Sequence, residues 1–185
     1  MKNIAILASG SGSNAEEIVK YFKDSQKGKV VLIASNKKDA FVLQRAEKLK
    51  IPHFTFTKSE LDSGKLVTKL QEAKVDWVVL AGFLLKIPAN LIQAFPDSIV
   101  NIHPALLPKY GGKGMYGMHV HQAVREAGDT VSGITIHLVN EQYDEGKIIF
   151  QAAVPISAED SPEDIAAKVH SLEYKYFPNV IESLL

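Results

Sequence analysis

Short apolar runs alternate with longer amphipathic segments through the first half of the chain. The apolar runs predict strands at residues 3–8, 30–35, 53–56, 77–81 and 99–103. The segments between them carry apolar residues at helical spacing, which predicts helices at residues 14–22, 40–49, 59–73 and 88–94. The run 77–81 is apolar throughout, as a strand buried on both faces of a parallel sheet requires. The alternation therefore predicts a doubly wound α/β sheet.

The pattern changes after residue 103. Residues 104–118 contain two prolines and four glycines without apolar periodicity, which predicts a long loop before a short helix at 119–127. Two further strands, 133–139 and 147–154, flank a polar turn, and this spacing predicts an antiparallel pair at one edge of the sheet. An amphipathic helix begins at Pro162. We expect one domain over residues 1–185, with a mostly parallel, doubly wound α/β sheet and an antiparallel pair at one edge.

Composition narrows the functional classes. Lys and Arg number 21, as do Asp and Glu, and nucleic-acid modules usually carry a basic excess, so we expect no nucleic-acid partner. The chain has no cysteine, which excludes disulfides, thiolate zinc sites and a cysteine nucleophile, and which agrees with a cytoplasmic protein. No apolar run reaches the length of a membrane span, so we expect no membrane partner either.

A small-residue loop, Ser-Gly-Ser-Gly-Ser-Asn at residues 9–14, separates the first strand from the first helix. Small residues let backbone N–H groups approach a phosphate, and the helix N-terminus adds partial positive charge. We expect phosphate binding here, with Ser13 or Asn14 as the N-cap. The alternative is a tight turn that only caps the helix.

The same loop satisfies the dinucleotide-binding pattern through Gly10, Gly12 and Ala15. That function expects an acidic residue after the second strand to hold the ribose hydroxyls. The sequence has Ser-Asn-Lys-Lys at 35–38 instead. The missing acid weakens the dinucleotide hypothesis. The hypothesis stays open because Lys37 and Lys38 could bind a 2′-phosphate.

Asn101 and His103 end the fifth predicted strand, immediately before Pro104. Strand geometry alternates faces, so the two side chains project together at the edge where open α/β sheets bind ligands. An amide can stabilise an oxyanion and an imidazole can move a proton. Asp144, in the turn between the last two strands, is a candidate charge partner that would raise the pKa of His103. The alternative is that all three residues only support loops and turns.

These residues resemble those of a known family. The stretch Asn-Ile-His-Pro-Ala-Leu-Leu-Pro-Lys-Tyr at 101–110 resembles the signature of folate-dependent formyltransferases. The loop at 9–14 and the turn Tyr-Asp-Glu-Gly at 143–146 are similar to those of the branch that formylates glycinamide ribonucleotide. The resemblance implies a formyltransferase fold from the first strand to the last helix.

The resemblance also implies roles for individual residues. The catalytic residues would be Asn101, His103 and Asp144. The residues that bind glycinamide ribonucleotide would be Gly12, Ser13 and Asn14, at its phosphate, and Glu173, at its glycinamide end. The residues that bind the folate would be Leu84, Leu85, Lys86, Ile87, Asn101, Asn140, Glu141, Tyr143 and Asp144. Without the resemblance, Glu173 would be interpreted as a solvated helix charge.

The implied reaction transfers the formyl group of 10-formyltetrahydrofolate to the amine of glycinamide ribonucleotide in purine biosynthesis. Asn101 and a protonated His103 would stabilise a tetrahedral oxyanion, with no metal, in a monomer or homodimer. One alternative is another formyl-folate enzyme, such as a deformylase or a different amine formyltransferase. The other is a nucleotide-binding module without catalysis.

Several features differ from the family pattern or stand outside it. Residues 111–117 form a longer, glycine-rich loop than in many relatives, interpreted either as a mobile lid or as a surface insertion. An Arg that contacts folate in some relatives is absent near Gly64 and Lys65. We interpret His119 and His121 as capping or solvent-exposed residues. His137 shares a strand face with Thr135 and is expected to look toward the site.

Overall fold

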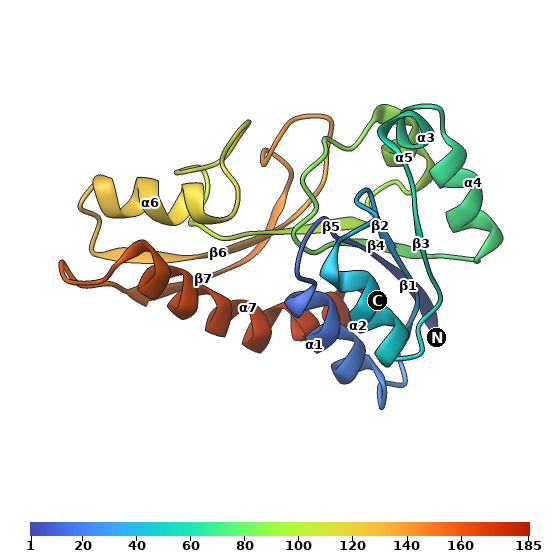
Figure 1. Ribbon diagram of the computed structural model, residues 1–185, viewed down its shortest axis with the longest axis horizontal. Coiled ribbons are helices and arrows are strands. Elements are labelled where there is room, and N and C mark those ends of the chain that lie inside the picture. The colour runs from blue at the N-terminus through green and yellow to red at the C-terminus, as the bar shows by residue number, and fades with distance from the viewer.

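The computed structural model describes all residues, 1–185, and contains one seven-stranded sheet (Figure 1). The strands are β1 (Lys2–Leu7), β2 (Gly28–Ser35), β3 (His53–Thr55), β4 (Trp77–Leu80), β5 (Ile99–His103), β6 (Val131–Leu138) and β7 (Ile148–Pro155). The helices are α1 (Ser13–Phe22), α2 (Phe41–Lys48), α3 (Lys58–Asp62), α4 (Lys65–Glu72), α5 (Ala89–Ala94), α6 (Met118–Glu126) and α7 (Pro162–Leu184).

The order of strands across the sheet is β3-β2-β1-β4-β5-β6-β7. Strands β1 to β5 pair in parallel, whereas β6 is antiparallel to both β5 and β7. The predicted fold class, a mostly parallel α/β sheet with an antiparallel pair at one edge, is therefore confirmed. None of the helices has the length and apolar character that crossing a membrane requires.

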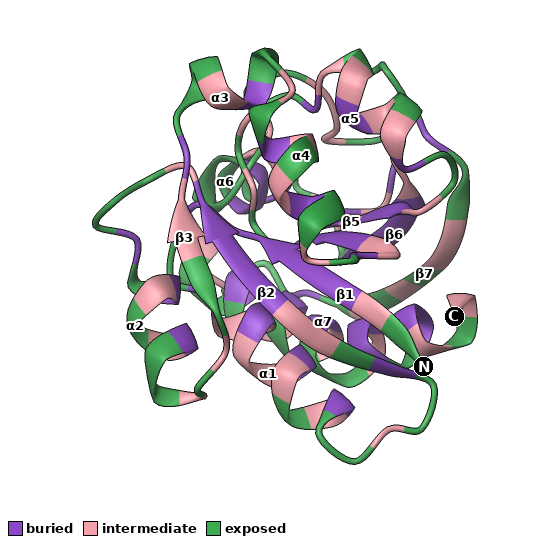
Figure 2. Ribbon diagram, turned by 90° about the vertical axis from the view of Figure 1, so that its right-hand side faces the viewer, coloured by how far each residue is buried: buried purple, intermediate pink, exposed green.

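Two hydrophobic cores cover the two faces of the sheet. Alternate residues of β1 enter opposite cores, with Ile4 and Ile6 in one and Ala5 and Leu7 in the other. The first core also takes buried residues from α1, α2, α6 and α7, and the second takes them from α3, α4 and α5. Figures 1 and 2 show α1, α2 and α7 on one side of the sheet and α3, α4 and α5 on the other. This burial on both faces explains the continuous apolar runs of the parallel strands.

The single helix predicted at 59–73 is wrong, because two helices occupy that segment. α3 ends at Asp62 and α4 begins at Lys65. Between them Gly64 adopts a φ of 83°, in the left-handed region that glycine enters without steric cost. The apolar spacing continues through the break, with Leu61 and Leu66 both buried, so apolar periodicity alone predicts one continuous helix.

The strand order creates a crevice at the carboxyl ends of β1 and β4. β1 lies between β2 and β4, so the chain winds outward to β3 on one side and then returns to β4 on the other. The loops that follow β1 and β4 diverge at such a switch point, where open α/β sheets bind ligands. Ser9 links the two loops, because its N–H donates to the Gly82 carbonyl at 3.0 Å and its Oγ accepts from the Leu84 N–H at 3.0 Å.

Candidate active site

A cavity of about 660 Å³ opens at this crevice, within the size range of small-molecule sites. Its walls come from the loop before α1, the segment after β4, the end of β5, the loop at 112–117, the β6–β7 turn and one face of α7. The predicted catalytic residues Asn101, His103 and Asp144 all line it. So do Gly12, Ser13, Asn14 and Glu173, the residues predicted to bind the ribonucleotide.

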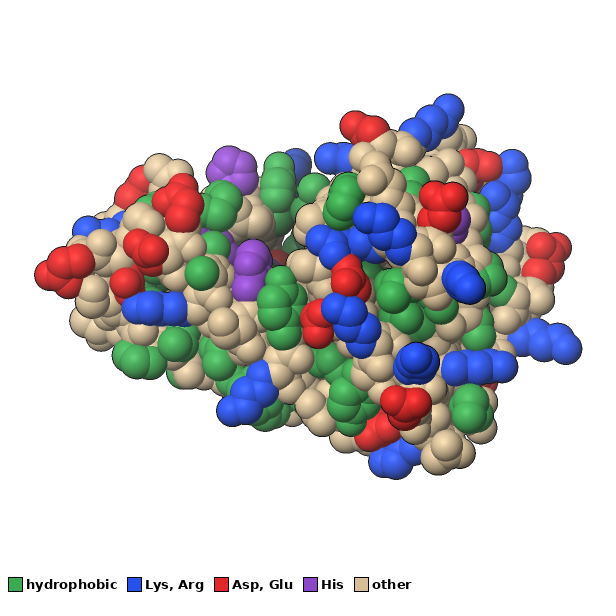
Figure 3. All heavy atoms as spheres, turned by 60° about the horizontal axis from the view of Figure 1, so that its bottom comes forward, with side chains coloured by type: hydrophobic (Ala, Val, Ile, Leu, Met, Phe, Trp, Pro, Cys, Tyr) green, Lys and Arg blue, Asp and Glu red, His purple; other side chains and the backbone are tan.

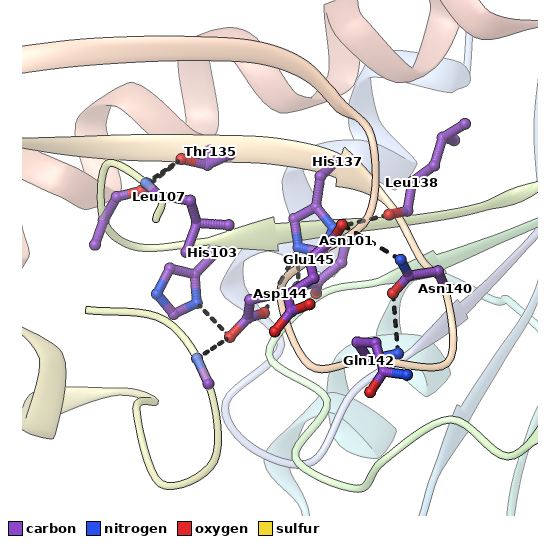
Figure 4. A network of polar contacts seen from close by, with 12 residues as sticks. Asn101, His103, Leu107, Thr135, His137, Leu138, Asn140, Gln142, Asp144 and Glu145 are labelled. Atoms are coloured by element: carbon purple, nitrogen blue, oxygen red, sulfur yellow. Dashed lines mark hydrogen bonds and ion pairs between the residues drawn. The ribbon is translucent and has the colours of Figure 1, made fainter. Parts of the chain in front are cut away.

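Asn101 is oriented by His137 on the neighbouring strand. The two residues face each other in the β5–β6 register, and Asn101 Nδ2 lies 3.1 Å from His137 Nε2 (Figure 4). His137 Nδ1 lies 2.9 Å from the Leu138 carbonyl, an acceptor only, so this nitrogen carries the proton. With the proton on Nδ1, Nε2 accepts from the Asn101 amide. The second N–H of that amide is left for a ligand, and the predicted orientation of His137 toward the site is confirmed.

The ring of His103 is held by a backbone carbonyl. His103 Nε2 lies 2.7 Å from the Tyr110 carbonyl oxygen and must therefore donate its proton there. The other nitrogen, Nδ1, faces Asp144 Oδ2 at 3.6 Å. Nδ1 is consequently the atom of His103 that can gain or release a proton.

Asp144 lies between the two imidazoles, as Figure 4 shows. One carboxylate oxygen is 3.6 Å from His103 Nδ1, and the other is 3.6 Å from His137 Nε2. The Gly112 N–H also donates to Asp144 at 2.9 Å. Burial raises the pKa of Asp144, but its contact with His137, the hydrogen bond from the Gly112 N–H and the nearby His103 outweigh this effect and hold that pKa below its ordinary value. Asp144 is therefore ionised at neutral pH.

The pKa of His103 lies below its ordinary value of 6.5. Burial is the largest cause, and it outweighs the attraction to Asp144 and the hydrogen bond to the Tyr110 carbonyl, both of which raise this pKa. The expectation of a protonated His103 is therefore wrong, although Asp144 acts in the predicted direction. The resting imidazole is neutral near pH 7 and can accept a proton.

An NMR titration of the His103 ring checks this assignment. In the ligand-free protein the midpoint is expected below pH 6.5, because burial disfavours the imidazolium. In Asp144→Asn the midpoint should fall further, since the variant removes the carboxylate that raises it. A midpoint above 6.5 in the parent protein, or an upward shift in the variant, would contradict the charge balance described here.

The loop before α1 presents free backbone donors. The N-cap of α1 is Gly12, with φ 73°, and no side chain caps the helix, so the prediction of Ser13 or Asn14 as N-cap is wrong. The N–H groups of residues 11–15 donate to no protein acceptor. Such a row of unpaired donors at a helix N-terminus suits an anion.

Asn14 and Glu173 connect this loop to the last helix. Asn14 Nδ2 donates to Glu173 Oε2 at 2.8 Å. Glu173 is only 5% exposed, and burial raises its pKa above the ordinary value. The interpretation of Glu173 as a solvated helix charge is therefore wrong. A buried acceptor and a row of free donors lie side by side on the cavity wall.

The predicted folate-binding residues line the cavity, with one exception. The cavity lining includes Leu84, Leu85, Lys86, Ile87, Asn140 and Tyr143. Glu141 lines an adjoining pocket of about 440 Å³ instead, which shares Lys86 and Tyr143 with the main cavity. Lys86 Nζ lies 5.6 Å from the centre of the Tyr143 ring. Lys65, which lies near the position of the absent Arg, lines neither pocket. Its Nζ forms a salt bridge with Glu60 Oε1 at 2.7 Å.

His121 is one of the cavity residues that sequence reasoning missed. It is only 2% exposed and lines the cavity together with His170 of α7, so its interpretation as a capping or solvent-exposed residue is wrong. His119 is exposed, as predicted. The signal was present in the sequence, because Val120 and Val124 define the buried face of α6 and His121 falls within it.

The glycine-rich loop is part of the cavity wall. Residues 112–117 all line it, and the Gly112 N–H bonds Asp144. The alternative of a mere surface insertion therefore fails. A lid-like movement of the loop stays a prediction.

Comparison with known proteins agrees with this geometry. Residues 2–181 match the formyl transferase family. A chloroplastic phosphoribosylglycinamide formyltransferase of Arabidopsis thaliana is 45% identical over 99% of the chain, which spans 65% of that relative's length. The phosphoribosylglycinamide formyltransferase of Bacillus subtilis is 39% identical, over 100% of the chain and 95% of the relative. A crystal structure of phosphoribosylglycinamide formyltransferase from Bacillus halodurans has a TM-score of 0.90 at 36% identity, covering 100% and 95% of the two chains. The chain belongs to the formyl transferase family.

Proposed function

We propose that this protein transfers the formyl group of 10-formyltetrahydrofolate to the amine of glycinamide ribonucleotide. The observation that carries the proposal is the meeting of Asn101, His103 and Asp144 with a row of free backbone donors in one cavity. The first group suits acyl transfer and the second suits a phosphate. The names of the relatives supply the identity of the acceptor.

The two substrates would enter from opposite sides of the catalytic residues. The N–H groups of Gly12, Ser13 and Asn14 bind the phosphate of the ribonucleotide, and Glu173 contacts its glycinamide end. The folate lies against the predicted pocket formed by Leu84, Leu85, Lys86, Ile87, Asn140, Tyr143 and Asp144. Glu141 would reach only a part of the folate that extends into the adjoining pocket.

In the first step the amine nitrogen attacks the formyl carbon. The carbonyl electron pair moves to oxygen, and the free N–H of Asn101 stabilises the resulting oxyanion. Neutral His103 accepts the proton of the amine at Nδ1, directly or through a water, and becomes an imidazolium. Asp144, 3.6 Å away, stabilises that charge as it develops.

In the second step the oxyanion re-forms the carbonyl, and the bond between the formyl carbon and N10 of the folate breaks. His103 returns its proton to N10, so the ring is neutral again at the end of the cycle. Each residue of the trio thus has one role: Asn101 holds the oxyanion, His103 carries the proton, and Asp144 stabilises the charged ring.

An assay with different acceptors tests the proposal. Purified protein receives 10-formyltetrahydrofolate with glycinamide ribonucleotide, with water alone, or with charged initiator tRNA, and loss of the formyl-folate is followed. We expect turnover only with the ribonucleotide. Equal turnover in water alone would indicate a deformylase, and turnover that requires tRNA would indicate a different amine formyltransferase.

Two further expectations stay predictions. The plant relative carries the word chloroplastic in its name, so a cytoplasmic location rests on composition alone. The state of association, monomer or homodimer, is testable by light scattering of the purified chain.

A further inference from the structure

Helix α2 donates two hydrogen bonds to the loop at residues 10–12. The Val42 N–H, at the start of α2, donates to the Gly10 carbonyl at 3.1 Å. Arg45 Nε, one turn further along, donates to the Ser11 carbonyl at 2.8 Å. Two successive carbonyl groups of the loop are therefore turned toward α2.

The orientation of these carbonyls determines where the next two N–H groups point. The peptide bonds of the loop are trans, and in a planar trans peptide the C=O and N–H point in opposite directions. No residue of α2 lines the cavity, whereas Gly10, Ser11 and Gly12 all do. The N–H groups of Ser11 and Gly12 are thus directed away from α2, toward the cavity, and neither has a protein acceptor.

The Arg45 guanidinium is itself fixed on three sides. It pairs with Glu16 in the first turn of α1, it lies 5.0 Å from the centre of the Phe41 ring, and it bonds the Ser11 carbonyl. Basic and acidic side chains lie interspersed on the face of α1, α2 and α7 (Figure 3). Lys20 also pairs with Glu16, so two cations offset the charge of this carboxylate. Unpaired, the Glu16 carboxylate would repel an anion at this helix N-terminus.

We propose that Arg45 is a positioning residue for the phosphate of the substrate: it turns the Ser11 carbonyl outward, so that the Gly12 N–H faces the phosphate, and it neutralises Glu16. The inference rests on the proposed function, because it assumes that the loop binds the phosphate of the ribonucleotide. Arg45 lines no part of the cavity, so it would act through the loop and not by direct contact with the phosphate.

The test uses Arg45→Met with two acceptors, glycinamide ribonucleotide and the same compound without its phosphate. The parent protein should have the higher kcat/KM with the ribonucleotide. In the variant this preference is expected to fall by about tenfold or more, because the hydrogen bond from the Gly12 N–H to the charged phosphate is misaligned. The loss should appear in KM, while kcat/KM for the dephosphorylated acceptor stays within about twofold of the parent. If Arg45 only packed α1 against α2, Arg45→Met would lower kcat/KM equally for both acceptors.

Two variants separate the parts of the proposal. Glu16→Gln removes the ion pair but keeps the Arg45–Ser11 hydrogen bond, and it should preserve or increase the preference for the phosphorylated acceptor. Arg45→Lys keeps the positive charge and should retain more of the preference than Arg45→Met. An unchanged preference in Arg45→Met, or an equal loss with both acceptors, would overturn the proposal.

A binding measurement keeps the inference separate from the proposed reaction. Calorimetric titration with ribose 5-phosphate should give weaker binding in Arg45→Met than in the parent. If the parent shows no formyl transfer but this difference remains, the proposed function fails and the role of Arg45 stands. If transfer occurs and ribose 5-phosphate binds both proteins equally, the role of Arg45 fails.

Discussion

Replacing His103 by Asn is expected to lower kcat by about two to four orders of magnitude, the usual contribution of a general acid–base residue. The variant removes Nδ1, which faces Asp144 at 3.6 Å and carries the proton between amine and folate in the proposed reaction. Substrate binding should change little, because the phosphate loop and the folate pocket do not depend on this ring. Steady-state kinetics with both substrates, together with a folate-binding titration, measures the two effects separately.

His53→Asn is the matched control for this substitution. His53 is exposed on β3, outside the cavity, and its variant should keep the parent rate. A His103→Asn protein that folds and retains nearly full turnover would show that the proton is carried by another group.

Gly12→Val is expected to raise the KM for the ribonucleotide by roughly two orders of magnitude, as the loss of two hydrogen bonds to a charged phosphate would do. A Cβ at this position would lie 2.4 Å from Val42 Cγ2 and 2.8 Å from Val42 Cα, so the loop would have to move away from α2. The φ of 73° is also unfavourable for a β-branched residue. The KM for the folate should change far less, because its predicted pocket lies across the catalytic residues.

Gly128→Val separates the effect on the loop from general backbone strain. Gly128 also has a positive φ, 67°, but lies outside the cavity with no atom within 4 Å of a built Cβ. This variant should lose stability in thermal unfolding while the KM for the ribonucleotide stays near the parent value. Equal increases in both KM values for Gly12→Val would contradict a phosphate-specific role of the loop.

The centre of the site was predictable because strand geometry has a strict period of two. Asn101 and His103 had to project from one face of β5, and the parallel sheet had to place that end of the strand beside the loop that follows β1. Asp144 followed from the predicted turn between the last two strands. These are local rules, and the sequence carries them directly.

Long-range packing decides the features that were missed. The protonation of His103 depends on how deeply the folded chain buries its ring, which no local sequence pattern reports. Arg45 acts through the carbonyl of Ser11, 34 positions away. In the sequence alone, nothing distinguishes Arg45 from any other charged residue near a helix end. The N-cap prediction failed for a related reason. The loop keeps its N–H groups free, against the usual preference for capping, and the Asn14 side chain turns to Glu173 instead.

The most direct test of the central claim follows the formyl carbon itself. Protein is mixed with 10-formyltetrahydrofolate labelled with ¹³C in the formyl group and with glycinamide ribonucleotide, and the products are observed by NMR. We predict that the label appears in the formamide of formylglycinamide ribonucleotide, in equal amount to the tetrahydrofolate released. Label that appears as free formate, or that stays on the folate when the ribonucleotide is present, would contradict the account.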